Sequence, residues 1–396
     1  MSTKQLTSKE RVLKTLRHEE PDRVPIGVLA FSSTVGSKIL GRLSYTGYRN
    51  LIHKKGAEAL VKGKGDQFIQ RKMRDRVELN RKLGIDTLLL IPAPSKDSII
   101  PKFIDSNTWI YANEATGEWR KIKYSPESGM CAERDSNIKK GRLDEFRRVT
   151  LLLEKRKSEV LNKVRETEFS KYPDGIIEES FILGMADIRI PFETSWFDVF
   201  LEAILLEPNL VERYLDIRLE ITLASLKRQI EFGIDGVTGG VDFAYNKGLM
   251  FSPTHFHKLI SPRLKVIVDE CHRNGLFYIK HTDGDIRAIE RDLFLEVGVD
   301  GYNPIDISAG MDLEDLKNKY GQKITLWGNV DDRYILAKGS REEVIEEVKR
   351  CLITAAKGGG YILGTSSGDI HSGVSLDNFL VMLEAAKKYG TYPIKL

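Results

Sequence analysis

The sequence predicts an α/β protein with a (β/α)8 barrel, the TIM-barrel class of fold. Eight short apolar runs occur along its 396 residues, and amphipathic helical patterns separate them. Each run is too short for an ordinary helix and is flanked by Gly, Asp or Pro. Alternation of buried strands with helices indicates a parallel sheet, and eight units can close it into a barrel. An open, doubly wound sheet is the alternative. The expected strands span residues 24–31, 86–91, 176–183, 235–242, 276–283, 300–306, 324–330 and 361–366.

Helices are expected between these strands. Ser340 with Glu343 three residues later forms a capping box, which predicts the start of a helix over residues 340–357. A further helix is expected over 252–274, which starts with a Ser252 cap followed by Pro253. A shorter helix is expected over 312–320, and Gly321 follows it. No Gly-x-Gly-x-x-Gly sequence follows a strand, so dinucleotide binding has no support.

Residues 95–150 do not follow the alternation of strand and helix patterns that predicts the barrel. Strand-forming residues at 108–111 and 118–120 flank turn residues at 113–117, which predicts a β-hairpin inserted after the second strand. Such an insertion can act as a lid over the barrel or as a stabilising flap that does not touch substrate, and the sequence leaves both open. The whole chain, residues 1–396, is expected to form one barrel domain around this insertion.

The composition excludes several functional classes. Hydrophobic residues make up 41% of the chain and charged residues 30%, which excludes a disordered protein. The net charge of +4 is too small for a nucleic-acid-binding surface. No run of 18 apolar residues could span a membrane, and the N-terminal residues lack the apolar core of a secretory signal. Cys131, Cys271 and Cys351 form no disulfide framework, so we expect a reducing cytoplasm.

Active sites of barrels lie at the carboxyl ends of the strands, and there His281 and Asp283 form the sharpest candidate pair. Side chains two residues apart on a strand point to the same face. Imidazole and carboxylate can together hold a divalent metal such as zinc, or act as an acid/base pair. A hydrogen-bonded pair that only fixes the loop is the third interpretation, and the residues alone do not decide among the three.

Other polar residues are expected at the same end of the barrel. Asp242 ends a Gly-rich run, and His371 lies in a polar loop after the last strand. Only one member of the Glu178–Glu179 pair can point into the barrel, because neighbours alternate along a strand. The candidate substrate-binding residues are Glu179, Tyr245, Asn303 and Asn329. No Gly-x-Ser-x-Gly, Walker loop or His-Glu-x-x-His occurs.

A series of short motifs gives the sequence a resemblance to a known family. The motifs are Glu10-Arg11-Val12-Leu13, Pro21-Asp22-Arg23-Val24-Pro25, Gly239-Gly240-x-Asp242, Ser252-Pro253-x-x-Phe256, His281-x-Asp283-Gly284, residues 298–304 (GVDGYNP), 327–331 (WGNVD) and 358–363 (GGGYIL). In this order they resemble the uroporphyrinogen decarboxylase superfamily over nearly the whole chain, most densely from about 230 to 390. The resemblance implies a (β/α)8 barrel, in agreement with the strand pattern.

The superfamily contains two chemistries. Its decarboxylases bind the carboxylates of a tetrapyrrole through an Arg-rich segment after the first strand, and need no cofactor. Here that segment keeps only Lys38 and Arg42 of the needed cations, which argues against a substrate with many carboxylates. The cobalamin-dependent methyltransferases that act on thiols hold zinc through a His-x-Cys motif, and in this chain Asp283 stands in place of that Cys.

The resemblance therefore favours a methyltransferase that removes a methyl group from a methoxylated, aromatic small molecule. It implies a corrinoid (cobalamin), supplied as Co(I) by a partner protein, and a zinc ion on His281 and Asp283. Without metal, His281 would be the acid and Asp283 would orient it, with Asp242 and His371 assisting. Trp109 and Trp119 could line the substrate or pack the hairpin. A homodimer is one assembly that the resemblance allows. A porphyrinogen-type decarboxylase and a non-catalytic barrel that binds a tetrapyrrole or corrinoid are the alternatives.

Overall fold

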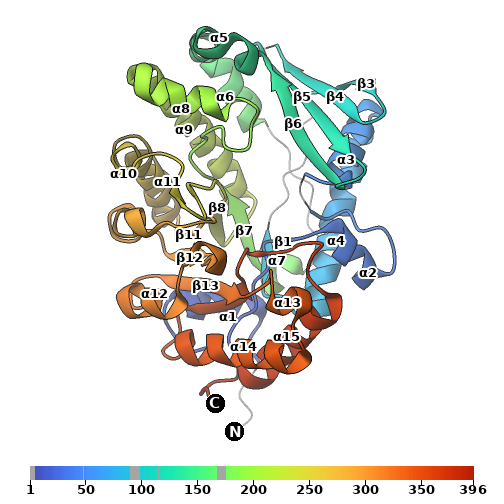
Figure 1. Ribbon diagram of the computed structural model, residues 1–396, viewed down its shortest axis with the longest axis vertical. Coiled ribbons are helices and arrows are strands. Elements are labelled where there is room, and N and C mark those ends of the chain that lie inside the picture. The colour runs from blue at the N-terminus through green and yellow to red at the C-terminus, as the bar shows by residue number, and fades with distance from the viewer. Residues whose placement is uncertain (1–4, 48, 90–98, 115, 167–174) are drawn as a thin grey trace.

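Seven parallel strands form the central sheet of the protein (Figure 1). The computed structural model describes residues 5–47, 49–89, 99–114, 116–166 and 175–396. Along the sheet the strands follow the order β14-β13-β12-β11-β8-β7-β2, so each strand lies beside its neighbour in the chain. Their bounds are β2 (Thr87–Leu89), β7 (Phe181–Met185), β8 (Gly236–Gly239), β11 (Phe277–His281), β12 (Gly301–Asn303), β13 (Thr325–Val330) and β14 (Tyr361–Thr365).

The first apolar run closes this sheet into a barrel. Ile26 pairs in parallel with Leu363 of β14, and on its other side the Ile26 carbonyl accepts a hydrogen bond from the Asp86 amide at 2.8 Å. Residues 24–28 thus lie between β14 and the start of β2 and supply the eighth parallel segment. The predicted (β/α)8 barrel is confirmed, and the open doubly wound sheet is excluded.

The third predicted strand needs a correction. The structure places a short helix, α7 (Ile176–Glu179), over the first half of the expected strand, and β7 begins only at Phe181. Gly175 has φ of +77° and starts that helical turn, whereas the run of apolar residues suggested continuous strand. The last residues of the second predicted strand, 90 and 91, lie outside the described residues.

Helices surround the barrel, and those expected from capping signals are present. The Ser340–Glu343 capping box occurs as predicted at the start of α14. The predicted helix 252–274 consists of α10, a π-helical turn over Phe256–Ile260 and α11. The helices are α1 (Ser8–Leu16), α2 (Ser33–Leu40), α3 (Leu51–Val61), α4 (Gly65–Leu83), α5 (Asn137–Lys155), α6 (Lys157–Arg165), α7, α8 (Phe197–Leu206), α9 (Pro208–Glu231), α10 (Pro253–His255), α11 (Ser261–Arg273), α12 (Leu313–Tyr320), α13 (Ile335–Lys338), α14 (Arg341–Ala355) and α15 (Leu376–Tyr389). Within the described chain, none of them is both long and apolar enough to cross a bilayer.

A buried carboxylate fixes the first strand, the second strand and the N-terminal helix together. Asp86 is fully buried and accepts from Arg11 at 2.7 Å, from Arg23 at 2.8 Å and from the Ile26 amide at 2.7 Å. Arg11 also pairs with Asp22 at 2.7 Å. Two guanidinium groups around one carboxylate offset its desolvation. This network accounts for the Glu-Arg-Val-Leu and Pro-Asp-Arg-Val-Pro motifs as structural features of the barrel base.

Trp327 fills the interior of the barrel. It packs with inward-facing residues of the other strands, and Val12 and Leu16 of α1 pack against the same cluster. Two glycines make room for the indole: a Cβ atom would lie 2.4 Å from the ring at Gly27 and 2.5 Å from Nε1 at Gly364. The barrel core is therefore closed by α1 and by one large side chain that requires small neighbours.

Gly364→Ala is expected to lower the free energy of unfolding by about 1–3 kcal/mol, because the added methyl group overlaps the Trp327 ring. Urea denaturation of the variant measures this loss. Gly240→Ala is the matched control, since no atom lies within 4 Å of its added Cβ. Equal stability of the two variants would contradict this account of the core.

The insertion after β2 is larger than the expected hairpin. It forms a four-stranded antiparallel sheet of β3 (Lys102–Asp105), β4 (Thr108–Asn113), β5 (Glu118–Ser125) and β6 (Met130–Ser136), seen at the upper right of Figure 1. Residues 108–113 pair with 118–123 in the β4–β5 ladder, so the predicted hairpin is present. Trp109 is fully buried against Ala57, Ile122 and Cys131. This tryptophan therefore packs the insertion and does not line substrate.

The inserted sheet is fastened to a loop that follows β7. Glu133 of β6 accepts hydrogen bonds from the Ser195 amide at 2.9 Å and from its hydroxyl at 2.7 Å. Arg49, beside β6, pairs with Glu193 at 3.0 Å. Because the loop begins at the carboxyl end of β7, these contacts hold the sheet at that end of the barrel, hereafter the mouth.

Candidate active site

His281 is the last residue of β11 and continues its inward-facing side. Phe277 and Ile279 pack in the barrel interior, whereas Tyr278 packs in the layer outside the barrel. The alternation of a strand thus brings the His281 ring to the mouth. Asp283 follows two residues later, on the turn that leaves the strand.

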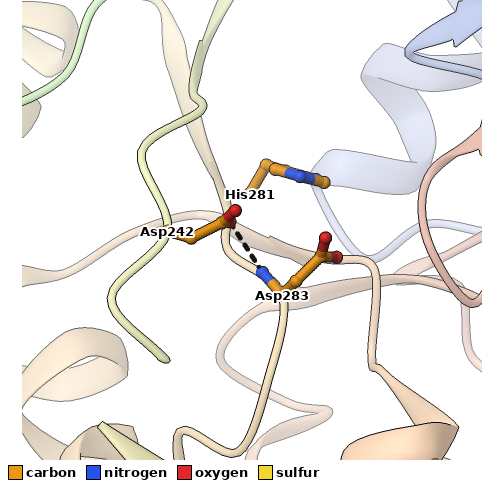
Figure 2. A group of neighbouring side chains, drawn as sticks. All are labelled: Asp242, His281 and Asp283. Carbon is orange, nitrogen blue, oxygen red and sulfur yellow. Dashed lines mark hydrogen bonds between the residues drawn. The ribbon is translucent and has the colours of Figure 1, made fainter. Parts of the chain in front are cut away.

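Asp242 joins this pair from the loop after β8. Ligand atoms of Asp242, His281 and Asp283 all lie within 4.8 Å of one another, and Figure 2 shows the three side chains together. Asp242 also accepts a hydrogen bond from the Asp283 amide at 2.9 Å. The predicted catalytic residues Asp242, His281 and Asp283 therefore form one cluster, here called the mouth triad.

A buried ion pair fixes the loop that carries Asp242. The Lys280 ammonium, which points outward from β11, donates to Asp187 at 2.5 Å and to the Val241 carbonyl at 2.6 Å. Asp187 in turn accepts from the Val241 amide at 2.9 Å. The residue before Asp242 is therefore held on both its amide and its carbonyl.

Asn303 sets the orientation and protonation of the His281 ring. Its Nδ2 donates to the Trp327 carbonyl at 3.0 Å, which turns Oδ1 toward His281 Nδ1 at 2.6 Å. Because an amide oxygen only accepts, Nδ1 carries the proton of the neutral ring and Nε2 keeps its lone pair. Asn303, expected as a substrate ligand, thus acts as a positioning residue that leaves Nε2 available for a metal or a proton.

Asp283 has the most perturbed carboxyl of the triad. Burial raises the pKa of Asp283 to about 7, with repulsion from Asp242, Asp306 and Asp369 adding to the effect, while His281 opposes it. Its Oδ1 atom is buried and has no hydrogen-bond partner among the described residues. A buried carboxylate oxygen without a partner is costly, so this atom is suited to a bound cation or to protonation near neutral pH.

Three further aspartates surround the triad. Asp306 accepts from the Gly284 amide at 3.2 Å and so ties the turn after β11 to the loop after β12. Burial raises the pKa of Asp369, and His281 and Arg76 oppose this shift, while Asp332 adds to it. The mouth is therefore a concentration of carboxyl groups whose charge is only partly compensated.

The loop after β14 presses against the His281 side of the cluster. Ser366 donates to Asp332 at 2.9 Å, and Ser367 also donates to Asp332. A Cβ atom at Gly368 would lie 2.6 Å from Asn303 Oδ1 and 3.4 Å from His281 Cε1. Only a residue without a side chain fits there. His371 stands at the outer edge of this loop, with Nε2 3.8 Å from Asp332 and its side chain 42% exposed.

Two predicted substrate residues lie elsewhere. Glu179 is at the amino end of β7, opposite the mouth, where it is exposed and pairs with Arg81 at 3.2 Å. This prediction depended on the wrong start of the third strand. Asn329 is buried and accepts from Arg350 of α14 at 3.2 Å, so its amide links the strand to an outer helix. Tyr245 is half exposed on the short strand β9 (Ala244–Tyr245), beside Gly284.

Sequence reasoning missed three residues that shape the site. They are Asp332 and Asp369, which lie beyond the ends of β13 and β14, and Arg76 of α4. Arg76 is buried on α4, donates to the Val28 and Leu29 carbonyls, and opposes the rise that burial causes in the pKa of Asp369. An isolated arginine within a charged helix such as 65–83 gives no signal of an inward position. Residues Ser366–Asp369 do carry a signal in the sequence, because this polar run directly follows the last strand.

The donor set of the mouth triad fits a divalent metal. One imidazole and two carboxylates can coordinate zinc or another transition metal of similar preference. The lone pair of His281 Nε2 and the unpartnered Oδ1 of Asp283 are the two atoms most available to it. A second donor group, His257, Asp292 and Glu296, lies on the exposed outer surface and offers a natural comparison.

The comparisons with known proteins place this site in a family. A family model described as uroporphyrinogen decarboxylase (URO-D) matches residues 194–389, a region that contains the mouth triad. Residues 194–389 of this chain therefore carry a uroporphyrinogen decarboxylase (URO-D) family domain. The resemblance expected from the motifs is confirmed.

Curated relatives in this superfamily match over a limited length. The uroporphyrinogen decarboxylases of Mannheimia succiniciproducens and Actinobacillus pleuropneumoniae serotype 5b are 27% and 25% identical over 195 residues. The aligned region is 46% of this chain and 49% of each relative, so the chain spans about half the length of the curated relatives that it matches.

A solved structure in the comparison covers the whole barrel. A methyltransferase from Methanosarcina mazei superimposes with a TM-score of 0.63 at 18% sequence identity. The superposition covers 97% of this chain and 99% of that protein. At this identity the likeness shows that the two proteins share a fold.

The raised pKa of Asp283 predicts a pH dependence of stability in protein kept metal-free with a chelator. The folded value, about 7, exceeds the ordinary value of 3.8, so the folded chain holds a proton that the unfolded chain loses between these values. The free energy of unfolding therefore falls as pH rises from about 4 to 7. Asp283→Asn cannot ionise and is expected to be about 1–3 kcal/mol more stable than wild type at pH 8.

Urea denaturation at pH 4.5, 6 and 8 measures this difference. Asp269→Asn is the control that keeps the wild-type slope, because the Asp269 side chain is half exposed and pairs only with Lys265, in the same helix, among the ion pairs of the described chain. A variant Asp283→Asn with the wild-type slope would show that the Asp283 carboxyl is not protonated in the folded protein.

Proposed function

We propose that this protein is a corrinoid-dependent methyltransferase that removes the methyl group of a methoxylated, aromatic small molecule. The acceptor would be the Co(I) corrinoid of a partner protein. The observation that carries the proposal is the mouth triad itself, a group of hard metal donors with an unpartnered buried oxygen. The methyltransferase fold of the Methanosarcina mazei protein, shared over nearly the full chain, supports the same class of reaction.

The charge of the mouth argues against the decarboxylase alternative. A tetrapyrrole with many carboxylates needs guanidinium partners, yet the mouth presents Asp242, Asp283, Asp306 and Asp369. Arg42, from the segment after the first strand, is engaged by Asp75 at 2.6 Å and by Glu78. Arg76 is buried beneath the mouth and donates to main-chain carbonyls. The described residues around the triad therefore suit a cation or a neutral ether better than a polyanion.

The chemistry of ether cleavage requires help for the leaving oxygen. When the methyl group departs, that oxygen becomes an alkoxide or phenoxide and needs a positive charge or a proton. A divalent metal held by His281, Asp283 and Asp242 would supply Lewis-acid stabilisation at this oxygen. The corrinoid supplies the nucleophile that accepts the methyl group.

The residues of the chain prepare the site for this reaction. Asn303 holds the His281 ring so that Nε2 faces the mouth, and the Lys280–Asp187 pair fixes the loop of Asp242. Without a bound metal, Asp283, with a pKa of about 7, can instead deliver a proton to the leaving oxygen at neutral pH. The inserted sheet, fastened to the loop after β7 by Glu133 and Ser195, would limit access of water as a lid.

The test is methyl transfer from a panel of methoxybenzenes to free cobalamin reduced to Co(I). Product phenol by chromatography and the change in corrinoid absorbance report the reaction. His281→Ala is expected to lower the rate at least about 100-fold, because it removes a metal ligand or an acid/base group. His257→Ala, which alters the exposed donor group, is the matched control and should keep the wild-type rate.

Two outcomes would contradict the proposal. Release of CO2 from uroporphyrinogen without a corrinoid, and no phenol from any methoxybenzene, would establish the decarboxylase alternative. Corrinoid binding that persists in His281→Ala, with neither reaction detectable in wild type, would establish a barrel that only binds the cofactor.

A further inference from the structure

A separate pocket lies between the inserted sheet and the helices that follow the first strand. It has a volume of about 220 Å³ and is lined by α3, by α4 and by Tyr111 of β4. Its apolar walls include Ile52, Leu60, Phe68 and Ile69. Leu60 and Phe68 are only half buried, so the pocket is accessible to solvent along that edge.

The polar groups of this pocket are all cationic or neutral. Arg49, His53 and Lys72 contribute to its lining, and no Asp or Glu is among the described residues that line it. Lys72 makes no hydrogen bond or ion pair within the described chain, and its ammonium lies 5.8 Å from the centroid of the Phe68 ring. Burial lowers the pKa of Lys72, as expected for an ammonium without a counter-charge.

His53 adds a second unsatisfied group. Its Nδ1 atom is buried and has no hydrogen-bond partner among the described residues. Burial lowers the pKa of His53 to about 4, with repulsion from Arg120, Lys72 and Arg49 contributing. The ring packs edge-on against Trp109 at 5.6 Å, so it cannot turn freely to find another partner. Two cations, Arg49 and Lys72, and an imidazole with an unpartnered Nδ1 thus line a cavity with apolar walls.

We propose that this pocket is a second ligand site, which binds a small organic carboxylate with a single apolar ring. The carboxylate would accept from the Lys72 ammonium and from a His53 N–H, and the ring would contact the apolar walls of α3 and α4. Its volume lies below the roughly 300–1,000 Å³ usual for drug-sized ligands, so a single-ring acid is the appropriate size. Charge-assisted hydrogen bonds inside an apolar cavity are the stronger kind.

The pocket is separate from the mouth triad but lies close to residues that surround the triad. Arg49 lines the pocket and pairs at 3.0 Å with Glu193, whose carboxyl experiences repulsion from Asp242. The Arg49–Glu193 pair therefore links the lining of the pocket to a carboxyl group that Asp242 influences. The site does not depend on the methyltransferase assignment, because no residue of the mouth triad lines the pocket.

Benzoate binding to the full-length protein, measured by isothermal titration calorimetry, tests the proposal. Benzoate is expected to bind with one site per chain, while benzyl alcohol, which lacks the charge, and inorganic phosphate, which lacks the ring, bind at least about tenfold more weakly. Lys72→Gln is expected to weaken benzoate binding about tenfold or more. Lys62→Gln removes the same charge from an exposed position at the end of α3 and should leave binding unchanged.

Leu60→Trp, which fills the pocket from its opposite wall, gives a second variant in case Lys72→Gln does not fold, and it should abolish binding. His281→Ala should bind benzoate as wild type does. The proposal would be overturned if wild type did not bind benzoate, or if benzoate and phosphate bound equally well. It would also be overturned if His281→Ala lost benzoate binding while the folded Lys72→Gln or Leu60→Trp protein kept it, because that result would locate the ligand at the mouth.

Discussion

The crowding of carboxyl groups at one end of the barrel is the constraint on which the rest of the site depends. Asp242, Asp283, Asp306 and Asp369 share a poorly solvated space, and their mutual repulsion and burial raise the pKa of Asp283 to about 7. Such an arrangement is stable only if a proton, a cation or a metal compensates it. His281 and Arg76 supply part of this compensation, because both oppose the rise that burial causes in the pKa of Asp369. The buried Oδ1 of Asp283 has no such compensation among the described residues, so it is the atom through which the site can bind a metal or a proton.

Residues next to the mouth triad hold its side chains and loops in place. Asn303 fixes the His281 ring, the Lys280–Asp187 pair fixes the approach to Asp242, and the hydroxyls of the loop after β14 hold Asp332. Gly368 lets that loop pack directly on the imidazole. A rigid scaffold of this kind keeps donors at fixed positions, which is how a barrel mouth supports metal or proton chemistry without relying on flexible side chains. The same scaffold explains why motifs around these residues are spread over most of the chain.

The fold could be predicted from sequence because strand and helix patterns alternate along the whole chain, and the first strand was recognisable although it joins the barrel through few pairings. The mouth triad could be predicted because His281 and Asp283 follow a strand at a spacing of two, and Asp242 ends another. Glu179 was misplaced because a single glycine at 175 converts the start of an apolar run into a helical turn. Asn329 faces an outer helix because Arg350 reaches its amide, a contact between distant segments that no local pattern reveals. Arg76 and the cations around the second pocket were missed for the same reason, since helix periodicity does not show which charged residue is turned inward.

Metal content of the purified protein tests the central claim most directly. After equilibration with excess zinc and removal of free metal, elemental mass spectrometry should find about one zinc per chain in wild type and in His257→Ala. His281→Ala should retain almost none. Zinc that is lost in His257→Ala and kept in His281→Ala would place the metal on the outer surface, at the group of His257, Asp292 and Glu296. Absence of zinc from all three proteins would contradict a metal site at the mouth and leave His281 and Asp283 as an acid/base pair.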